Sequence, residues 1–183
     1  MSESQSMMKK FNPLFWMQNP GNTPKGSRRD FINPEWIPWT DWLMPGTYFK
    51  LLYCDLVSGS FTLLLKVDPG VKATPHWHVS NAQAYIIEGG FYYEDGDDKG
   101  YEGYYTSETA GSIHEPFTTP QGCTMFAISH GPIAGYTDEG QLVVMADARL
   151  HYYMARENNA IEYTTVVDYS YGSTDLQWKE NAK

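Results

Sequence analysis

Apolar and polar positions alternate in short runs along most of the chain, and turn-forming residues separate the runs. Alternation with a period of two is typical of β-strands, because successive side chains on a strand point to opposite faces. The runs follow one another at intervals of about 8–12 residues, as in antiparallel sandwiches and small barrels. The pattern predicts strands at 48–55, 61–67, 72–79, 83–93, 101–106, 112–115, 123–129, 141–145 and 161–169.

One helix is predicted, over 146–157, where most residues are good helix formers. A loop is expected at 116–122, which contains two prolines, and a polar hairpin tip at 95–100. Helices do not alternate with strands, which excludes a doubly wound nucleotide-binding sheet. We therefore expect one all-β domain over 46–183, with the helix and a last strand near its C-terminal end.

Residues 1–45 follow a different pattern, without a clear period. Prolines interrupt them too often for a long helix or a central strand, yet they contain four tryptophans. A disordered tail is not normally so aromatic. We expect this N-terminal extension to pack across the barrel or on a partner subunit, and we expect a homodimer or homotetramer.

Composition limits the function. The 183 residues include 22 acidic and 13 basic side chains, a net charge of −9, so neither nucleic acid nor an anionic membrane surface is an expected partner. No apolar stretch approaches the roughly 20 residues of a membrane-spanning helix, and no signal peptide is evident. Two cysteines, Cys54 and Cys123, are expected to be reduced thiols. We expect a cytoplasmic protein that acts on a small molecule.

The histidines are the candidate chemistry. His76 and His78 are two positions apart in a predicted strand, so their imidazoles share one face and can converge on one ion. Taken alone, such a pair is more often two unrelated surface or core histidines. His114 and His130 are the candidates for a third ligand. His151 lies on the predicted helix and is expected at the surface.

The surroundings of this pair resemble the first sequence motif of the cupin superfamily. Gly70, His76, His78 and Gly90 stand at the motif's intervals, and Gln83 occupies its glutamate position. The second motif fits less well, because its histidine position falls near Gln121. His114 is preferred as the third ligand, since it lies between the Gly111 and Pro116 landmarks of that motif, whereas His130 ends a predicted strand.

Other segments resemble the ChrR-like cupin branch and, within it, the 2,4′-dihydroxyacetophenone dioxygenases. They are Trp36-Ile37-Pro38, Pro45-Gly46 with Lys50-Leu51-Leu52, His76-Trp77-His78, and 110–116. The resemblance implies a cupin jelly-roll barrel that holds non-haem Fe(II) on His76, His78 and His114 without a carboxylate, although Zn, Ni or another divalent metal would also suit three imidazoles.

The resemblance also implies an activity: cleavage of a C–C bond by dioxygen in a small chelating ketone, such as an α-hydroxyketone or a β-diketone. Two alternatives remain open. The first is a lyase or isomerase that uses the metal only as a Lewis acid, and the second is a non-enzymatic cupin that senses a metal or ligand.

Further site residues are expected from strand parity. Gln83 is expected to hydrogen-bond a substrate oxygen or a ligand histidine, and Tyr85 and Ile87 share its parity, so all three should line the same cavity. Phe126 and Met145 are weaker candidates for the lining. Glu88 and Glu115 have the opposite parity and are expected to point outward.

Overall fold

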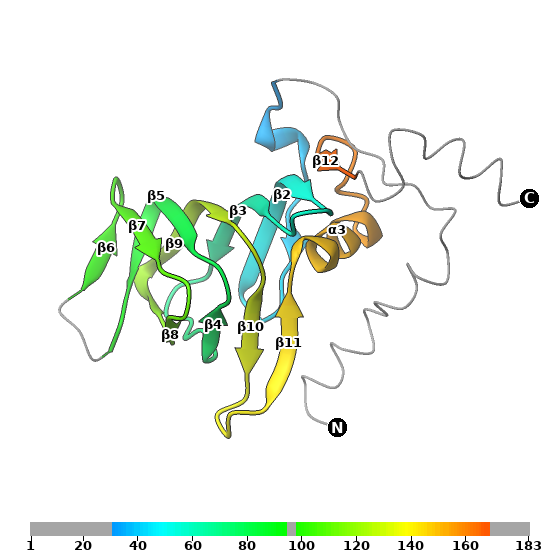
Figure 1. Ribbon diagram of the computed structural model, residues 1–183. Coiled ribbons are helices and arrows are strands. Elements are labelled where there is room, and N and C mark those ends of the chain that lie inside the picture. Colours follow the sequence, from blue (N-terminus) through cyan, green and yellow to red (C-terminus); the bar gives the residue numbers. More distant parts are fainter. Residues whose placement is uncertain (1–30, 95–97, 169–183) are drawn as a thin grey trace, which may run out of the picture.

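The computed structural model of the chain describes residues 31–94 and 98–168, and these form two β-sheets and a helix (Figure 1). The larger sheet has the strand order β1-β2-β3-β9-β5-β6, with β12 beside β2 and β7 beside β5. All its pairs are antiparallel except β12 with β2. Its strands are β1 (Thr40–Asp41), β2 (Thr47–Asp55), β3 (Phe61–Val67), β5 (Ala82–Tyr92), β6 (Lys99–Tyr101), β7 (Tyr105–Glu108), β9 (Phe117–Ser129) and β12 (Thr165–Val167).

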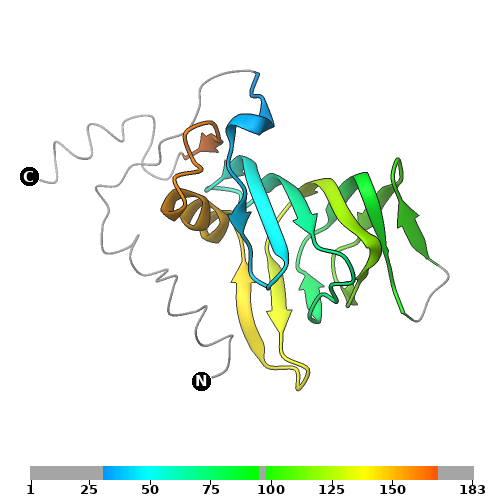
Figure 2. The same cartoon turned by 180° about the vertical axis from the view of Figure 1, so that it is seen from behind.

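The smaller sheet has four antiparallel strands in the order β11-β10-β4-β8. They are β4 (His76–His78), β8 (Ile113–His114), β10 (Ile133–Tyr136) and β11 (Leu142–Ala146). Figures 1 and 2 show the two sheets from opposite sides, with the β10–β11 hairpin extending beyond the rest of the fold. The all-β expectation with one C-terminal helix is confirmed.

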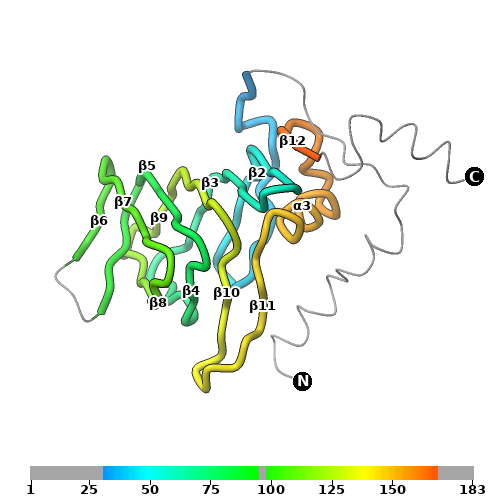
Figure 3. Tube along the Cα trace, in the orientation of Figure 1, coloured from blue at the N-terminus to red at the C-terminus, as the bar shows by residue number. Residues whose placement is uncertain are grey.

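The helix α3 (Ala148–Glu157) covers one end of the two sheets, at the far end from β6 (Figure 3). Asp147 caps it by accepting a hydrogen bond from the backbone of Leu150 at 2.8 Å. Its buried residues pack with side chains of β2 and β3 in the larger of two apolar clusters. A smaller cluster lies around Ile86, Phe91 and Cys123, on β5 and β9.

The expectation that His151 lies at the surface is wrong, because this helix turns it into the larger cluster, where it is fully buried. Its ring stacks on Phe61 at a centroid distance of 4.2 Å. Trp42 Nε1–H donates to His151 Nε2 at 2.9 Å, and the backbone carbonyl of Asp147 accepts from Nδ1 at 2.7 Å. Both ring nitrogens are thus satisfied in one neutral tautomer.

The segment before β1 lies on the outer side of β2. It contains the short 3-10 helix η1 (Pro34–Trp36). Lys50, whose side chain is only 3% exposed, donates to the carbonyl of Pro34 at 3.0 Å and to Glu35 at 3.2 Å. Its ammonium lies 4.9 Å from the ring centroid of Trp39. Residues 1–30 of the predicted N-terminal extension lie outside the described residues, and its boundary stays a prediction.

Several predicted elements need correction. The expected loop at 116–122 is wrong, because β9 begins at Phe117 and runs through Pro120. Gly122 makes this run feasible: its φ is +77°, and a Cβ there would lie 2.7 Å from the carbonyl oxygen of Val67. β10 was not predicted, and the last predicted strand is reduced to β12. None of the helices in 31–94 and 98–168 is long and apolar enough to span a membrane.

Candidate metal centre

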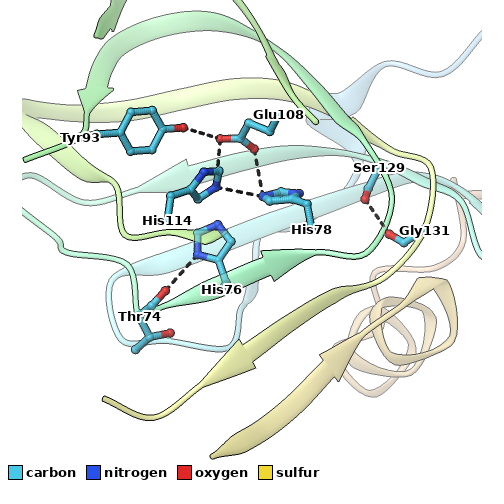
Figure 4. A network of polar contacts seen from close by, with 8 residues as sticks. All are labelled: Thr74, His76, His78, Tyr93, Glu108, His114, Ser129 and Gly131. Atoms are coloured by element: carbon cyan, nitrogen blue, oxygen red, sulfur yellow. Dashed lines mark hydrogen bonds and ion pairs between the residues drawn. The ribbon is translucent and has the colours of Figure 1, made fainter. Parts of the chain in front are cut away.

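Three imidazoles meet on the face of the smaller sheet that turns toward the larger one (Figure 4). His76 and His78 share a face of β4, as predicted from their spacing. His114 is brought to them by the pairing of β8 with β4, in which it is the direct partner of His76. The three ring centroids are 4.6 to 5.2 Å apart, and one nitrogen from each ring lies within 4.8 Å of the others.

The hydrogen bonds indicate which nitrogens face the common point. The carbonyl of Thr74 lies 3.0 Å from His76 Nδ1 and can only accept, so Nδ1 carries the hydrogen and Nε2 keeps its lone pair. The Nε2 atoms of His78 and His114 are 3.1 Å apart. Two imidazole nitrogens bound at about 2.1 Å to one ion, at right angles, would be about 3 Å apart. The donor set and its spacing therefore fit a divalent metal ion.

Burial keeps these imidazoles neutral. It is the main cause that lowers the pKa of His78 to about 3 and that of His114 to about 4, and the neighbouring histidines lower them further. Burial also lowers the pKa of His76, against the opposing hydrogen bond to Thr74. A neutral imidazole is the form that ligates metals, so the three side chains need not lose a proton to bind an ion near pH 7.

A carboxylate completes the cluster, and sequence reasoning missed it. Glu108, at the end of β7, lies 3.2 Å from Nε2 of His78 and 3.4 Å from Nε2 of His114. The hydroxyl of Tyr93 donates to Glu108 Oε1 at 2.8 Å. Burial raises the pKa of Glu108, while the hydrogen bond from Tyr93 lowers it. The resemblance implied a site of three histidines without a carboxylate. The structure instead shows the three histidines together with Glu108, which lies beside His78 and His114.

The signal for Glu108 lies in strand pairing and in no local motif. Glu108 is the direct partner of Ala82 across the β5–β7 ladder, and directly opposed residues share a face. Ala82, Ala84 and Ile86 are buried on this face. The face of β5 that turns toward the histidines therefore carries Ala82, Ala84 and Ile86. The neighbouring strand β7 adds Glu108 to the same face.

The same register corrects the expectation that Gln83 and Tyr85 line the metal cavity. Both alternate with Ala82 and Ala84, so they point to the opposite, outer face of the larger sheet, where Tyr85 is 50% exposed. Phe126 is the partner of Tyr85 and lies on that outer face too, and Ile87 is 44% exposed. The proposed roles of these residues at the site are therefore wrong.

Two further candidates also lie away from the cluster. Met145 pairs with Ala134, which pairs with Trp77, and this row faces away from the side of β4 that carries His76 and His78. His130 is exposed and is not a member of the histidine group. Of the two candidates for a third histidine, the structure brings His114 to the pair.

The family model of the ChrR cupin-like domain matches residues 27–134. No curated protein matches. Among solved structures, a Ralstonia eutropha protein of unknown function with a cupin-like fold aligns with a TM-score of 0.66 at 22% identity, over 78% of this chain and 96% of that one.

Two similar structures have names that state an activity. The acetylacetone dioxygenase of Acinetobacter johnsonii aligns with a TM-score of 0.63 at 16% identity, over 74% of this chain and 96% of that one. A protein of Methylibium petroleiphilum, described as a putative acetylacetone dioxygenase, aligns with a TM-score of 0.59 at 17% identity, over 68% and 92%. At these identities the likeness establishes a shared cupin fold.

Proposed function

We propose that this chain, which belongs to the family of ChrR cupin-like domains, is a metal-dependent dioxygenase that cleaves a C–C bond of a small chelating ketone. The observation that carries the proposal is the convergence of His76, His78 and His114, three neutral imidazoles whose nitrogens lie within 4.8 Å of one another. The substrate class follows from the chemistry of that donor set, and iron is the metal that the sequence resemblance implies.

The three imidazoles are neutral, so none of them compensates the charge of a divalent ion, and the one negative group beside them is Glu108, which contacts His78 and His114. Such a centre still suits an anionic substrate that binds through two oxygens, such as the enolate of an α-hydroxyketone or of a β-diketone. When bound, iron would supply Lewis-acid polarisation of those oxygens and the redox chemistry with dioxygen. The reaction consumes one dioxygen, and both its oxygen atoms end in the two carbonyl products.

The protein's own groups would orient the ligands and handle the proton. The Thr74 carbonyl fixes the tautomer of His76, and the Tyr93 hydroxyl holds Oε1 of Glu108. Glu108 Oε2 lies 3.2 Å from Nε2 of His78, and a carboxylate beside the ligand histidines would be a suitable base for the proton lost on enolate formation.

Oxygen uptake tests the proposal. Protein loaded anaerobically with Fe(II) is mixed with a panel of α-hydroxyketones and β-diketones in an oxygen electrode, and products are identified by mass spectrometry. We expect uptake of one dioxygen per ketone cleaved, and its loss in His114→Ala. His130→Ala removes an exposed histidine instead and should keep the activity. Metal-loaded protein that consumes no oxygen with any member of the panel would contradict the dioxygenase assignment.

A second candidate is a lyase or isomerase that uses the ion only as a Lewis acid. The position of Glu108 favours it, because a carboxylate beside the ligands can remove and return a proton without an oxidant. The same panel, incubated without oxygen and examined by NMR in D2O, separates the two. Net rearrangement or cleavage of a ketone in the absence of oxygen, with no uptake in the oxygen electrode, would support this candidate, whereas deuterium exchange alone is expected of both. Tight metal binding with neither exchange, rearrangement nor oxygen uptake would point to a sensing role.

A further inference from the structure

One ring nitrogen of His78 has no hydrogen-bond partner within the described part of the chain, although the side chain is almost fully buried. Its Nε2 lies 3.1 Å from Nε2 of His114 and 3.2 Å from Oε2 of Glu108, so this nitrogen faces the point where the imidazoles converge. The nitrogen without a partner is Nδ1. A histidine that ligates a metal through Nε2 carries its hydrogen on Nδ1 and normally donates it to an oxygen. His78 therefore needs an acceptor.

His76 shows the complete arrangement. Its Nδ1 lies 3.0 Å from the carbonyl oxygen of Thr74, which accepts the hydrogen and leaves Nε2 for the ion (Figure 4). The carbonyls that reach His78 and its neighbour across the sheet already accept backbone N–H groups: that of Ser112 accepts from His78 at 3.0 Å, and that of Pro132 from Val79 at 3.2 Å. A side-chain oxygen is therefore the more available acceptor for His78 Nδ1.

Strand pairing limits which side chain this can be. β4 lies between β10 and β8, and on β10 the direct partner of His78 is Ile133, which is apolar. On β8 the register that pairs His76 with His114 continues to Ser112 opposite His78. Directly opposed residues share a face and have Cβ atoms about 5 Å apart. Of the two side chains that flank His78 on its own face, only that of Ser112 offers an oxygen.

The hydroxyl of Ser112 lacks a partner as well. Its Oγ is buried and has no hydrogen bond within the described residues. The backbone keeps it beside His78: Gly111, with a φ of +90°, donates to the His78 carbonyl at 2.8 Å, and Ser112 N–H donates to Thr109 at 3.1 Å. A hydroxyl oxygen can accept the hydrogen that Nδ1 must donate. Two buried groups with complementary requirements thus stand on directly opposed residues, where buried polar groups are normally paired.

Ser129 is the competing acceptor. It pairs with Ala82, which is also the partner of Glu108, so it lies on the face of the larger sheet that turns toward the histidines. Its hydroxyl already donates to the carbonyl of Gly131 at 2.7 Å (Figure 4). Ser129 therefore has a structural partner, whereas the hydroxyl of Ser112 has none in the described part of the chain.

We propose that Ser112 is a positioning residue of the metal centre. Its hydroxyl oxygen accepts the hydrogen of His78 Nδ1, directly or through one water molecule, and thereby holds the Nε2 lone pair toward the ion. The inference rests on the metal centre of the proposed function, but it requires neither the ketone nor dioxygen.

Zn(II) affinity, measured on the full chain by competition with a chelator, gives the first test. Ser112→Ala should bind Zn(II) about tenfold or more weakly than the wild type, because an acceptor of a ligand histidine is lost. Ser112→Thr keeps the hydroxyl and should restore most of the affinity. Ser129→Ala removes the competing hydroxyl and should bind as the wild type does. Ser107→Ala, at an exposed position of β7, is the matched control for the substitution.

Imidazole NMR of the Zn(II)-loaded, 15N-labelled protein gives a readout that a merely structural role of Ser112 would not move. The Nδ1–H proton of His78 should be protected from exchange with solvent in the wild type and in Ser112→Thr. In Ser112→Ala this proton should exchange faster and its resonance should shift. The Nδ1–H proton of His76, which is bonded to Thr74, should be the same in all of these proteins and serves as the internal reference.

Three results would overturn the proposal: Zn(II) binding and a His78 Nδ1–H signal that Ser112→Ala leaves unchanged, losses that Ser112→Thr does not restore, or losses that occur in Ser129→Ala instead. A folded wild type that binds no Zn(II) would remove the metal centre on which the inference rests. Failure of oxygen uptake with ketones leaves these measurements unaffected, so the dioxygenase reaction and the role of Ser112 are tested separately.

Discussion

The buried His151 makes the stability of the fold sensitive to acid. In the neutral tautomer it accepts from Trp42 Nε1–H and donates to the Asp147 carbonyl. Protonation of Nε2 would break the bond to Trp42 and place a charge among aromatic rings. Burial is the main cause that lowers the His151 pKa from 6.5 to about 4, while the bond to Asp147 opposes this shift.

The size of the effect follows from that shift. The unfolded chain takes up the proton below pH 6.5, and the folded chain resists it until about pH 4. The stability is therefore fully present above pH 6.5 and falls as the pH drops toward 4. Since one pKa unit corresponds to about 1.4 kcal/mol, the His151 contribution lost by pH 4.5 is about 2 to 3 kcal/mol.

Comparison with His151→Phe isolates this contribution, because the acid sensitivity of the three site histidines cancels between the two proteins. Urea unfolding is followed by tryptophan fluorescence at four pH values between 7.5 and 4.5, with a chelator present. At pH 7.5 the variant should be less stable by about 1–3 kcal/mol, because Trp42 loses its acceptor. By pH 4.5 this difference should vanish or reverse, because the wild type alone has then lost about 2 to 3 kcal/mol. His130→Phe, at an exposed position, is the matched control, and a difference from His151→Phe that stays constant with pH would refute the reasoning.

Three further outcomes are expected. Glu108→Gln should keep about one metal per chain but lower turnover by about a hundredfold or more, since a general base is lost; unchanged turnover would exclude Glu108 from proton transfer. Zn(II) affinity should change little between pH 7.5 and 5.5, because burial keeps His78 and His114 neutral there; a fall of about a hundredfold, as two imidazoles of ordinary pKa would give, would contradict their burial. Gly89→Ala should destabilise the fold by more than about 2 kcal/mol in thermal or urea unfolding, since its Cβ would lie 2.1 Å from the carbonyl oxygen of Gly122. Gly59→Ala, which also has a positive φ but open space around it, should cost clearly less.

Local sequence signals were sufficient to predict several elements and part of the site. The strand at 61–67 was predicted with the bounds that the structure gives, because turn-forming residues at 57–60 and 68–70 delimit it on both sides. The helix was predicted to within two residues, since most residues of this segment are good helix formers. The histidine pair was recognised because two residues at i and i+2 on a strand must share a face.

The remaining features of the site depended on the pairing of strands that are distant in the chain. A single sequence does not show which strands pair or in which register. Gln83 was placed at the site because it fills a motif position, but the pairing of Ala82 with Glu108 sets the opposite phase for β5. A change of one residue in phase moved Tyr85 and Ile87 to the outer face as well. Glu108 was missed because no neighbour in sequence marks it as a site residue. His151 was misplaced because a polar residue on a helix is usually exposed, and here the partners that satisfy its ring come from Trp42 and the helix N-cap.

The central claim is that His76, His78 and His114 together hold one divalent metal ion. Metal analysis of protein loaded with Fe(II) under anaerobic conditions tests it most directly, with His114→Ala and His130→Ala loaded beside the wild type. We expect about one iron per chain in the wild type and in His130→Ala, and little in His114→Ala. Iron retained by a folded His114→Ala variant, or a wild type that binds none, would contradict the account.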